Sequence, residues 1–163
     1  SGDMASLPET ALRTLNTQLQ EISEDYDYIV MDLGAGIERN VRFLAALADR
    51  VVIVLTDEPT SLTDAYAFIK LCLQQGNASE IQVVVNQAAT QKEGERTYAA
   101  LNKACTSFLN YSPLLLGIIR KDNKVRETIR SQSPMLKKAP QSTAATDAAA
   151  ISVKLMQSQM QAA

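Results

Sequence analysis

The chain has 163 residues, a length that favours one domain with a hydrophobic core, and a formal charge of −2, which does not indicate a nucleic-acid binder. It contains no histidine, which excludes Ser-His-Asp and Cys-His catalysis and every metal site built on histidine. Its longest apolar runs have the length of strands, so we expect no membrane-spanning helix. Cys72 and Cys105 lie far apart in segments that predict helices, and we expect both to be buried, reduced core residues.

The first third of the chain predicts a helix, a strand and a second helix. Ser6-Leu-Pro-Glu9 has the spacing of a capping box, and apolar residues recur at helical spacing from there to Ile22. The run "YIVMD" (28–32) is short, continuous and apolar, which is typical of a strand buried on both faces. A helix is predicted from residue 37 to residue 48.

Two buried strands are predicted next, "VVIVLT" (51–56) and "IQVVVN" (81–86), with a helix between them. The segment "DEPTSLTD" (57–64) is interpreted as a loop followed by the start of that helix, and Gly76 is expected to end it. The candidate capping residues are Thr60, Ser61 and Thr63.

The remaining chain predicts a fourth strand, "LLLGII" (114–119), with helices before and after it. A short helix is predicted within 120–129, and a last helix from about residue 142 to 160 follows a segment that two prolines interrupt. On the helix before the fourth strand, the side chains expected to face the core are those of Leu101, Cys105, Phe108 and Leu109.

Strands that alternate with helices predict an α/β fold with three layers, in which a doubly wound, mostly parallel sheet is covered on both faces. In such sheets, ligands bind beyond the carboxyl ends of the strands. All four predicted strands end in polar or glycine residues, so their ends are expected to share one rim. These ends are Asp32–Gly36, Thr56–Pro59, Asn86–Ala88 and Arg120–Asp122.

Three interpretations of Asp32 and the glycines after it stay open on the residues alone. Gly34-Ala-Gly36 followed by Asp57 imitates a dinucleotide-binding fingerprint, but Arg39 stands where the third glycine belongs. A carboxylate at a strand end can instead hold Mg²⁺, while glycines let backbone N–H groups approach a phosphate. The third interpretation is a tight turn with a capping aspartate.

The other rim residues also have two interpretations each. Asp57 and Glu58 are either an acid/base pair or devices that stabilise a helix start. Asn86 either meets a base edge with its amide or starts a turn. Asp122 either belongs to a loop that contacts a ligand or caps the helix that follows it. The neighbouring cations are either a solvated face or a site for an anion or acidic partner; they are Arg120, Lys121, Lys124, Arg126 and Arg130.

Taken in order, these segments resemble the C-terminal half of the MinD/ParA-type ATPases, P-loop proteins with a deviant Walker A loop. "VMDLGAGIE" is similar to the switch II segment of that family. "TDEPTSLTDAYAFIK" resembles the flagellar branch, the flagellar-number regulators called FlhG, FleN or YlxH. "VVVNQA", "EGERTY" and "GIIRKDNKVRE" fall in matching places, and the resemblance covers residues 1–160.

The resemblance implies roles for individual residues. Asp32 matches the switch II aspartate that holds the Mg²⁺ shell, through water, and Gly36 matches the glycine whose backbone contacts the γ-phosphate, with Gly34 and Ala35 shaping the loop. Asn86 matches the asparagine that contacts adenine, and the loop from Arg120 to Asp122 matches the segment beside the base, although Arg120 replaces a proline of many relatives. The residues matched to a dimer interface are Asp57, Glu58, Pro59, Thr60 and Ser61.

The lysine-rich P-loop of this family is absent, because the chain contains no Gly-Lys-Thr or Gly-Lys-Ser. We therefore expect residues 1–163 to be a single domain, the C-terminal part of a MinD-like ATPase domain whose N-terminal strands are missing. The resemblance implies a Mg-dependent ATPase for the intact parent and no activity for this chain alone. Because the P-loop strand would separate the first two predicted strands, we expect unpaired strand edges, low stability and aggregation.

The resemblance also implies ATP and Mg²⁺ as cofactors, a homodimer in the ATP-bound state, and protein partners such as a polar GTPase or the flagellar transcription regulator. Nucleic acid is not an expected partner. A cytoplasmic location is expected, and a peripheral place at the membrane or cell pole stays open; the weakly amphipathic end "ISVKLMQSQMQAA" does not favour a membrane anchor. The alternatives are a non-catalytic MinD-like regulator, a ParA-type partitioning ATPase and a Rossmann dehydrogenase half.

Overall fold

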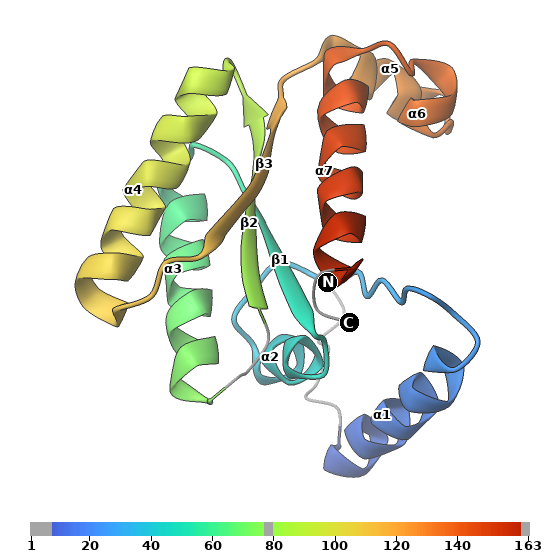
Figure 1. Cartoon of the computed structure of the whole chain (residues 1–163), viewed down its shortest axis with the longest axis vertical. Helices are drawn as coiled ribbons and strands as arrows, with labels where there is room; N and C mark the ends of the chain where they lie inside the picture. Colours follow the sequence, from blue (N-terminus) through green and yellow to red (C-terminus); the bar gives the residue numbers. More distant parts are fainter. Residues whose placement is uncertain (1–7, 77–79, 161–163) are drawn as a thin grey trace.

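The computed structural model describes residues 8–76 and 80–160 and has a three-stranded parallel sheet at its centre (Figure 1). The strands lie in the order β1 (Arg50–Leu55), β2 (Glu80–Ala88) and β3 (Leu114–Arg120). β2 pairs in parallel with β1 over their whole shared length and with β3 up to the Ala88–Arg120 pair. The last three predicted strands and their parallel direction are therefore confirmed.

Helices cover both faces of this sheet, so the predicted three-layer α/β architecture is confirmed. α3 (Pro59–Gln74) and α4 (Gln91–Leu109) lie on one face, and α7 (Thr143–Met160) packs on β3 from the other face (Figure 1). α1 (Glu9–Ser23), α2 (Arg39–Ala46), α5 (Asn123–Arg130) and the short α6 (Met135–Lys138) complete the described part. None of the helices described is long and apolar enough to cross a bilayer.

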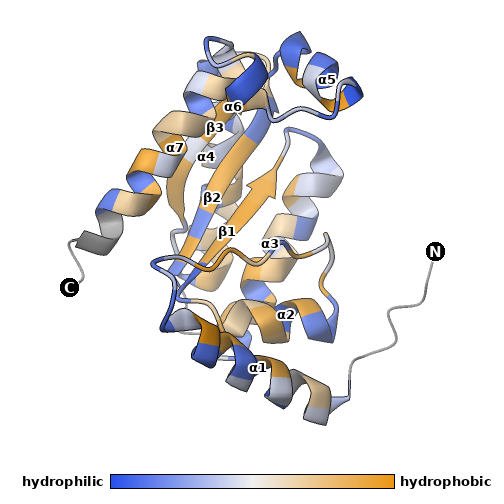
Figure 2. Ribbon diagram, turned by 90° about the vertical axis from the view of Figure 1, so that its right-hand side faces the viewer, coloured by the Kyte–Doolittle hydropathy of each residue, from blue (hydrophilic) through white to orange (hydrophobic). Residues whose placement is uncertain are grey.

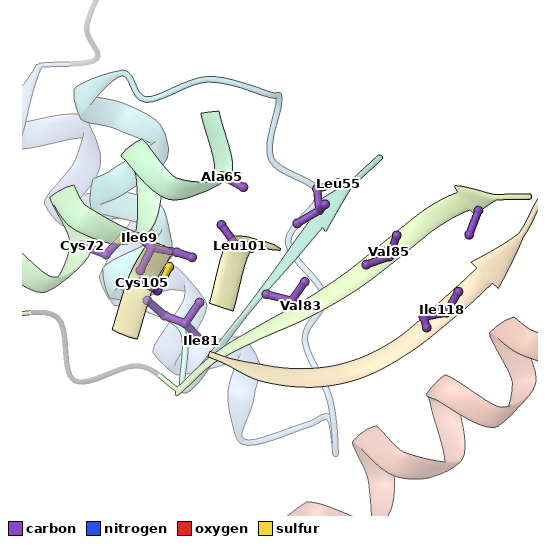
Figure 3. Packing of buried hydrophobic residues seen from close by; sticks show 11 residues of the cluster. Leu55, Ala65, Ile69, Cys72, Ile81, Val83, Val85, Leu101, Cys105 and Ile118 are labelled. Atoms are coloured by element: carbon purple, nitrogen blue, oxygen red, sulfur yellow. The ribbon is translucent and has the colours of Figure 1, made fainter. Parts of the chain in front are cut away.

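The main core lies between the sheet and the pair α3–α4 (Figure 3). Alternate residues of the strands point into it, because successive side chains of a strand face opposite sides. Cys72 and Cys105 are buried there and form no disulfide with each other, as predicted, and burial raises the pKa of Cys105. The buried cluster consists of Leu55, Ala65, Ile69, Cys72, Ile81, Val83, Val85, Ala88, Leu101, Cys105 and Ile118. Both amide atoms of Gln82, on the other side of β2, are buried without a hydrogen-bond partner, and nothing in the described structure explains them.

The predicted strand at 28–32 is wrong. This segment runs between α1 and α2 without regular secondary structure (Figure 2). It is mostly exposed, and Val30 is 90% exposed. An apolar run becomes a strand only when a neighbour accepts its hydrogen bonds, and no described strand pairs with it. Within residues 8–76 and 80–160, β1 pairs on one side only, and its Val52 and Val54 are 38% and 59% exposed. The expected open edge is therefore present at β1, whereas the second expected edge does not exist as a strand.

Smaller differences concern helix ends. Phe108 is 78% exposed rather than inward, because Leu109 and Tyr111 fill this end of the core and the Tyr111 hydroxyl accepts a hydrogen bond from the Ile81 amide at 3.3 Å. α3 begins at Pro59 without a side-chain cap, so the predicted threonine or serine cap is wrong. α6 was not predicted, although both prolines do flank it. The Ser6 capping box lies outside the described residues.

Gly94 allows α4 to approach β3, and its replacement tests how tightly the core is packed. A Cβ added at Gly94 would lie 2.5 Å from Cγ2 of Ile118. Alanine normally stabilises a helix relative to glycine by about 1 kcal/mol, but overpacking costs about 1–3 kcal/mol. We expect Gly94→Ala to lower the free energy of unfolding by about 1 kcal/mol in urea titrations. The control Ala100→Gly, at an exposed position of α4, measures the difference in helix propensity between alanine and glycine on the same helix. If Gly94→Ala were more stable than the parent, α4 could shift away from β3 to accommodate the added methyl group.

The open edge of β1 predicts aggregation that one lysine should reduce. Val54→Lys places a charge on this edge, where lysine opposes the addition of further strands. Since Val54 is largely exposed, we expect little change in the unfolding midpoint and less light scattering on heating. Val153→Lys, on half-exposed Val153 of α7, makes the same change of charge elsewhere. Equal reduction of scattering in both variants would attribute the effect to charge rather than to the edge.

Candidate functional site

The carboxyl ends of β2 and β3 are joined by hydrogen bonds into one continuous rim. The Lys121 amide donates to the Ala88 carbonyl at 2.8 Å, just beyond the Ala88–Arg120 pair. The ladder is irregular between Val85 and Ala88, where Gln87 has a φ of 59°. The Gln87 amide donates to Oδ1 of Asn86 at 2.9 Å, which fixes the Asn86 side chain at the edge of the sheet. Irregularities of this kind re-aim side chains beside binding sites.

Arg120 is held by Asp147, the fifth residue of α7. Oδ2 of Asp147 accepts from the backbone amide of Arg120 at 3.0 Å and from its Nε at 2.9 Å, and Oδ1 accepts from Nη2 at 2.7 Å. The Asp147 side chain is only 12% exposed. The hydrogen bond from the guanidinium lowers the pKa of Asp147, and the same bond raises the pKa of Arg120. Sequence reasoning missed Asp147, whose only signal was a lone acid in an alanine-rich stretch.

Asp122 connects the same loop to two helices. It is the N-cap of α5, where Oδ1 accepts from the Lys124 amide at 2.8 Å, and Oδ2 accepts from the Ala144 amide of α7 at 3.3 Å. These backbone hydrogen bonds, Lys124 first, lower the pKa of Asp122. The helix-cap interpretation of Asp122 is confirmed. Contact between this loop and a base stays a prediction.

The end of β1 forms a short turn into α3. The Thr56 amide donates to Oγ of Ser61 at 3.0 Å, and Pro59 occupies the first helical position after Glu58. Asp57 and Glu58 are exposed, and the Glu58 side chain does not cap α3. Thr60 is exposed as well. The turn leaves these side chains accessible, and their role in a dimer interface stays a prediction.

The loop Asp32–Gly36 is exposed, and within the described residues no hydrogen bond or ion pair links it to the rim. Gly36 has a φ of 141°, which favours glycine, and a Cβ there would collide with the Glu38 carboxylate. The structure therefore brings Asn86 and Arg120–Asp122 together but does not connect Asp32 to them. No group of three or more metal-ligating acids or cysteines occurs in the described part. One exposed carboxylate nevertheless suits Mg²⁺, which keeps several waters and uses one or two carboxylates beside the phosphates of its ligand.

Residues 3–156 match a protein family described as cellulose biosynthesis protein BcsQ. Antiactivator FleN of Pseudomonas aeruginosa is 34% identical over 83% of this chain and 48% of its own length. Flagellum site-determining protein YlxH of Helicobacter pylori is 36% identical over 70% of this chain and 38% of its own length. The chain thus spans half or less of the length of these curated relatives.

Solved structures agree on the fold. A MinD cell division protein from Aquifex aeolicus superposes with a TM-score of 0.71 at 23% identity, covering 90% of this chain and 61% of that one. The septum site-determining protein MinD from Pyrococcus horikoshii, solved with Mg-ADP, superposes with a TM-score of 0.66 at 19% identity. The match covers 86% of this chain and 54% of that one. The predicted MinD-like α/β architecture is therefore confirmed.

The ion pair at the rim predicts a pH-dependent stability. The pKa of Asp147 is lowered on folding, so its contribution is present above the unfolded value of about 3.9 and is lost as pH falls through the folded pKa. Asp147→Asn leaves Arg120 unpaired and should unfold at lower urea concentration than the parent at neutral pH. We expect this difference to shrink below about pH 4. The control Asp64→Asn, at an exposed acid of α3, should leave the unfolding midpoint almost unchanged. If the midpoints of Asp147→Asn and the parent differed by the same amount at every pH, the role of the ionised Asp147 carboxylate would be contradicted.

Proposed function

Because the chain belongs to the BcsQ family of MinD/ParA-type proteins, we propose that its rim is the base side of a Mg-ATP site in a molecular switch that controls the number or placement of flagella. In this proposal, residues 1–163 are one domain, the C-terminal part of a MinD-like ATPase domain. The parent is a Mg-dependent ATPase. The likeness to FleN and YlxH supports the flagellar role.

The observation that carries the proposal is the hydrogen-bonded rim made by Asn86–Ala88 and Arg120–Asp122. Asn86 is fixed by the Gln87 amide, and its side-chain NH₂ is available to an acceptor on a base. The loop beside it is held by the Lys121 amide on β2 and by Asp147 on α7. A base that lies against this edge would meet side chains that are already positioned, which lowers the entropy cost of binding.

Asp32 would supply the carboxylate for Mg²⁺, and the backbone from Gly34 to Gly36 would approach the γ-phosphate. When bound, Mg²⁺ would neutralise charge on the phosphates, which is the main chemical requirement of phosphoryl transfer. The exposed position of Asp32 and the unusual φ of Gly36 support this assignment. The missing partner is a phosphate-binding lysine loop, which the sequence of this chain does not contain.

The proposed switch is a homodimer when ATP is bound, with Asp57–Ser61 at the interface, and it acts on flagellar regulatory proteins. The accessible turn at the end of β1 supports the interface. The name antiactivator, given to the relative FleN, supports a regulatory protein as partner. Hydrolysis would then change which partner the switch binds.

Isothermal calorimetry with Mg-ATP tests the proposal. The chain is measured alone and after fusion to the part of FleN from Pseudomonas aeruginosa that lies outside the matched 48% of its length. We expect binding only by the fusion, because each half holds part of the ligand. Asp32→Ala should abolish the Mg²⁺-dependent part of the affinity. Asn86→Ala should weaken the binding of ATP more than that of GTP. The expected loss of ATP affinity is about tenfold, which corresponds to one hydrogen bond to a base.

Asp64→Ala, at an exposed acid away from the rim, is the matched control for Asp32→Ala and should bind normally. Circular dichroism must show the same fold for every variant. A folded fusion that binds no nucleotide would contradict the proposal and favour a regulator that works through protein contacts alone. Binding of a nicotinamide dinucleotide in preference to ATP would favour the Rossmann alternative.

A further inference from the structure

The last residue pair of the ladder between β2 and β3 is separated from the rest of that ladder. Regular pairing is interrupted between Val85 and Ala88, where the Gln87 backbone has a φ of 59°, and it resumes at the Ala88–Arg120 pair. Just beyond this pair, the Lys121 amide donates to the Ala88 carbonyl. A single pair beyond an irregularity has few neighbouring hydrogen bonds to support it, so it should open more readily than the centre of the sheet.

The end of β3 is held on its other side by a side chain of α7. Consecutive residues of a strand direct their backbone hydrogen-bonding groups to opposite sides. The Lys121 amide turns towards β2, whereas the Arg120 amide turns away from it and donates to Oδ2 of Asp147 at 3.0 Å. Among the described strands, β3 pairs only with β2. Asp147 thus occupies the place on the outer edge that a further strand would otherwise take.

The Asp147 carboxylate also fixes the Arg120 side chain. Its two oxygens accept from Nε at 2.9 Å and from Nη2 at 2.7 Å, the two-pronged geometry in which a guanidinium binds a carboxylate most strongly. Ion pairs on the surface contribute little to stability, but the Asp147 side chain is only 12% exposed. Removing this carboxylate would take three hydrogen bonds from one residue of β3 and leave its cation without that partner.

The helix that carries Asp147 is itself fixed against β3 (Figure 1). Nζ of Lys154, two turns further along α7, donates to the Leu116 carbonyl at 3.1 Å. Between these two contacts, Ile151 lies so close to Gly117 that a Cβ on this glycine would collide with it. Asp147 is therefore a firm anchor, because α7 cannot move along or away from β3 without breaking these contacts.

The anchored pair supports the segment that carries Asn86. Asn86 lies in the interrupted part of β2, two residues before Ala88, and its Oδ1 accepts from the Gln87 amide at 2.9 Å. If the Ala88–Arg120 pair opened, this segment would lose its support on the β3 side. The distance between the Asn86 amide and the loop that follows β3 would then no longer be fixed.

We propose that Asp147 is a positioning residue of the base-binding edge. It holds the end of β3 against β2 and thereby fixes Asn86 relative to the loop from Arg120 to Asp122, without itself touching a base. The inference rests on the proposed function only in naming a base as the occupant of this edge. Its first test needs no nucleotide, so the two proposals can fail separately.

The first test measures amide hydrogen exchange by NMR on the chain alone. The Lys121 amide reports on the bond to Ala88, the Gln87 amide reports on the orientation of Asn86, and the Val83 amide in the centre of β2 reports on global unfolding. Asp147→Ala removes all three hydrogen bonds to Arg120. Asp147→Asn keeps one carbonyl oxygen that can accept from the Arg120 amide, and it remains informative if Asp147→Ala does not fold.

The matched control is Glu127→Ala, which removes one partner of another ion pair. In that pair, Lys124–Glu127 of α5, both side chains are 57% exposed. We expect Asp147→Ala to speed exchange at Lys121 and Gln87 by at least about tenfold relative to Val83. Asp147→Asn should have a smaller effect, and the control should have none. Equal acceleration at all three amides would overturn the proposal, because it would indicate a global loss of stability, and so would unchanged exchange at Lys121.

The second test measures binding by calorimetry in the fusion with the FleN segment, with ATP and with inorganic tripolyphosphate as ligands. Since the edge meets the base and not the phosphates, Asp147→Ala should weaken ATP at least about fivefold and leave tripolyphosphate nearly unchanged. Equal weakening of both ligands would overturn the proposal. A parent fusion that binds neither ligand would contradict the proposed ATP site, and the exchange measurement would then decide this inference by itself.

Discussion

The pairing of β2 on both sides determines where the main core and the rim of this molecule lie. A parallel neighbour can be reached only through a crossover, and right-handed crossovers place α3 and α4 on the same face. Ile81, Val83 and Val85 of β2 are then buried against these helices. The same parallel direction sends all three carboxyl ends to one edge. The rim is therefore a consequence of backbone pairing, and its side chains need only be polar to make it a site.

The opposite face depends on α7, which holds both ends of the sheet. Near its N-terminal end, the Asp147 carboxylate accepts hydrogen bonds from Arg120, and the Ala144 amide donates to Asp122 in the loop that follows β3. Near its other end, the Leu155 carbonyl accepts from Nη1 of Arg50 at 2.9 Å, at the start of β1. Between them, the missing side chain of Gly117 leaves space for Ile151. A single helix thus covers little of β1 but fixes the rim, which explains how exposed β1 residues coexist with a well-held loop.

Patterns local in sequence predicted most of this structure, and contacts distant in sequence account for what they missed. Three strands and the main helices follow from apolar runs and periodicity. The segment 28–32 has the same apolar character as β1, but character alone does not supply a hydrogen-bonding neighbour. The pair Arg120–Asp147 spans 27 residues, and no spacing rule connects them. The positions of Asn86 and Asp122 on the rim were predicted because apolar runs show where each strand ends. The sequence did not predict that Asp32 lacks a link to the rim.

The loop from Arg120 to Asp122 joins the proposed base-binding edge of the sheet to α5 and α7. Its amides and side chains contact β2, α5 and α7 at once, so it cannot move without breaking bonds to all three. A partner that shifts α5 would pull on the Asp122 cap, and through it on the edge that holds Asn86. If one ligand binds more tightly to one position of this loop, it changes the affinity for the other ligand. The second ligand then changes the affinity for the first by the same factor, because coupling between two binding sites is reciprocal. The hydrogen bonds of Asp122 and Asp147 are therefore the physical connection through which the proposed switch would couple nucleotide binding to partner binding.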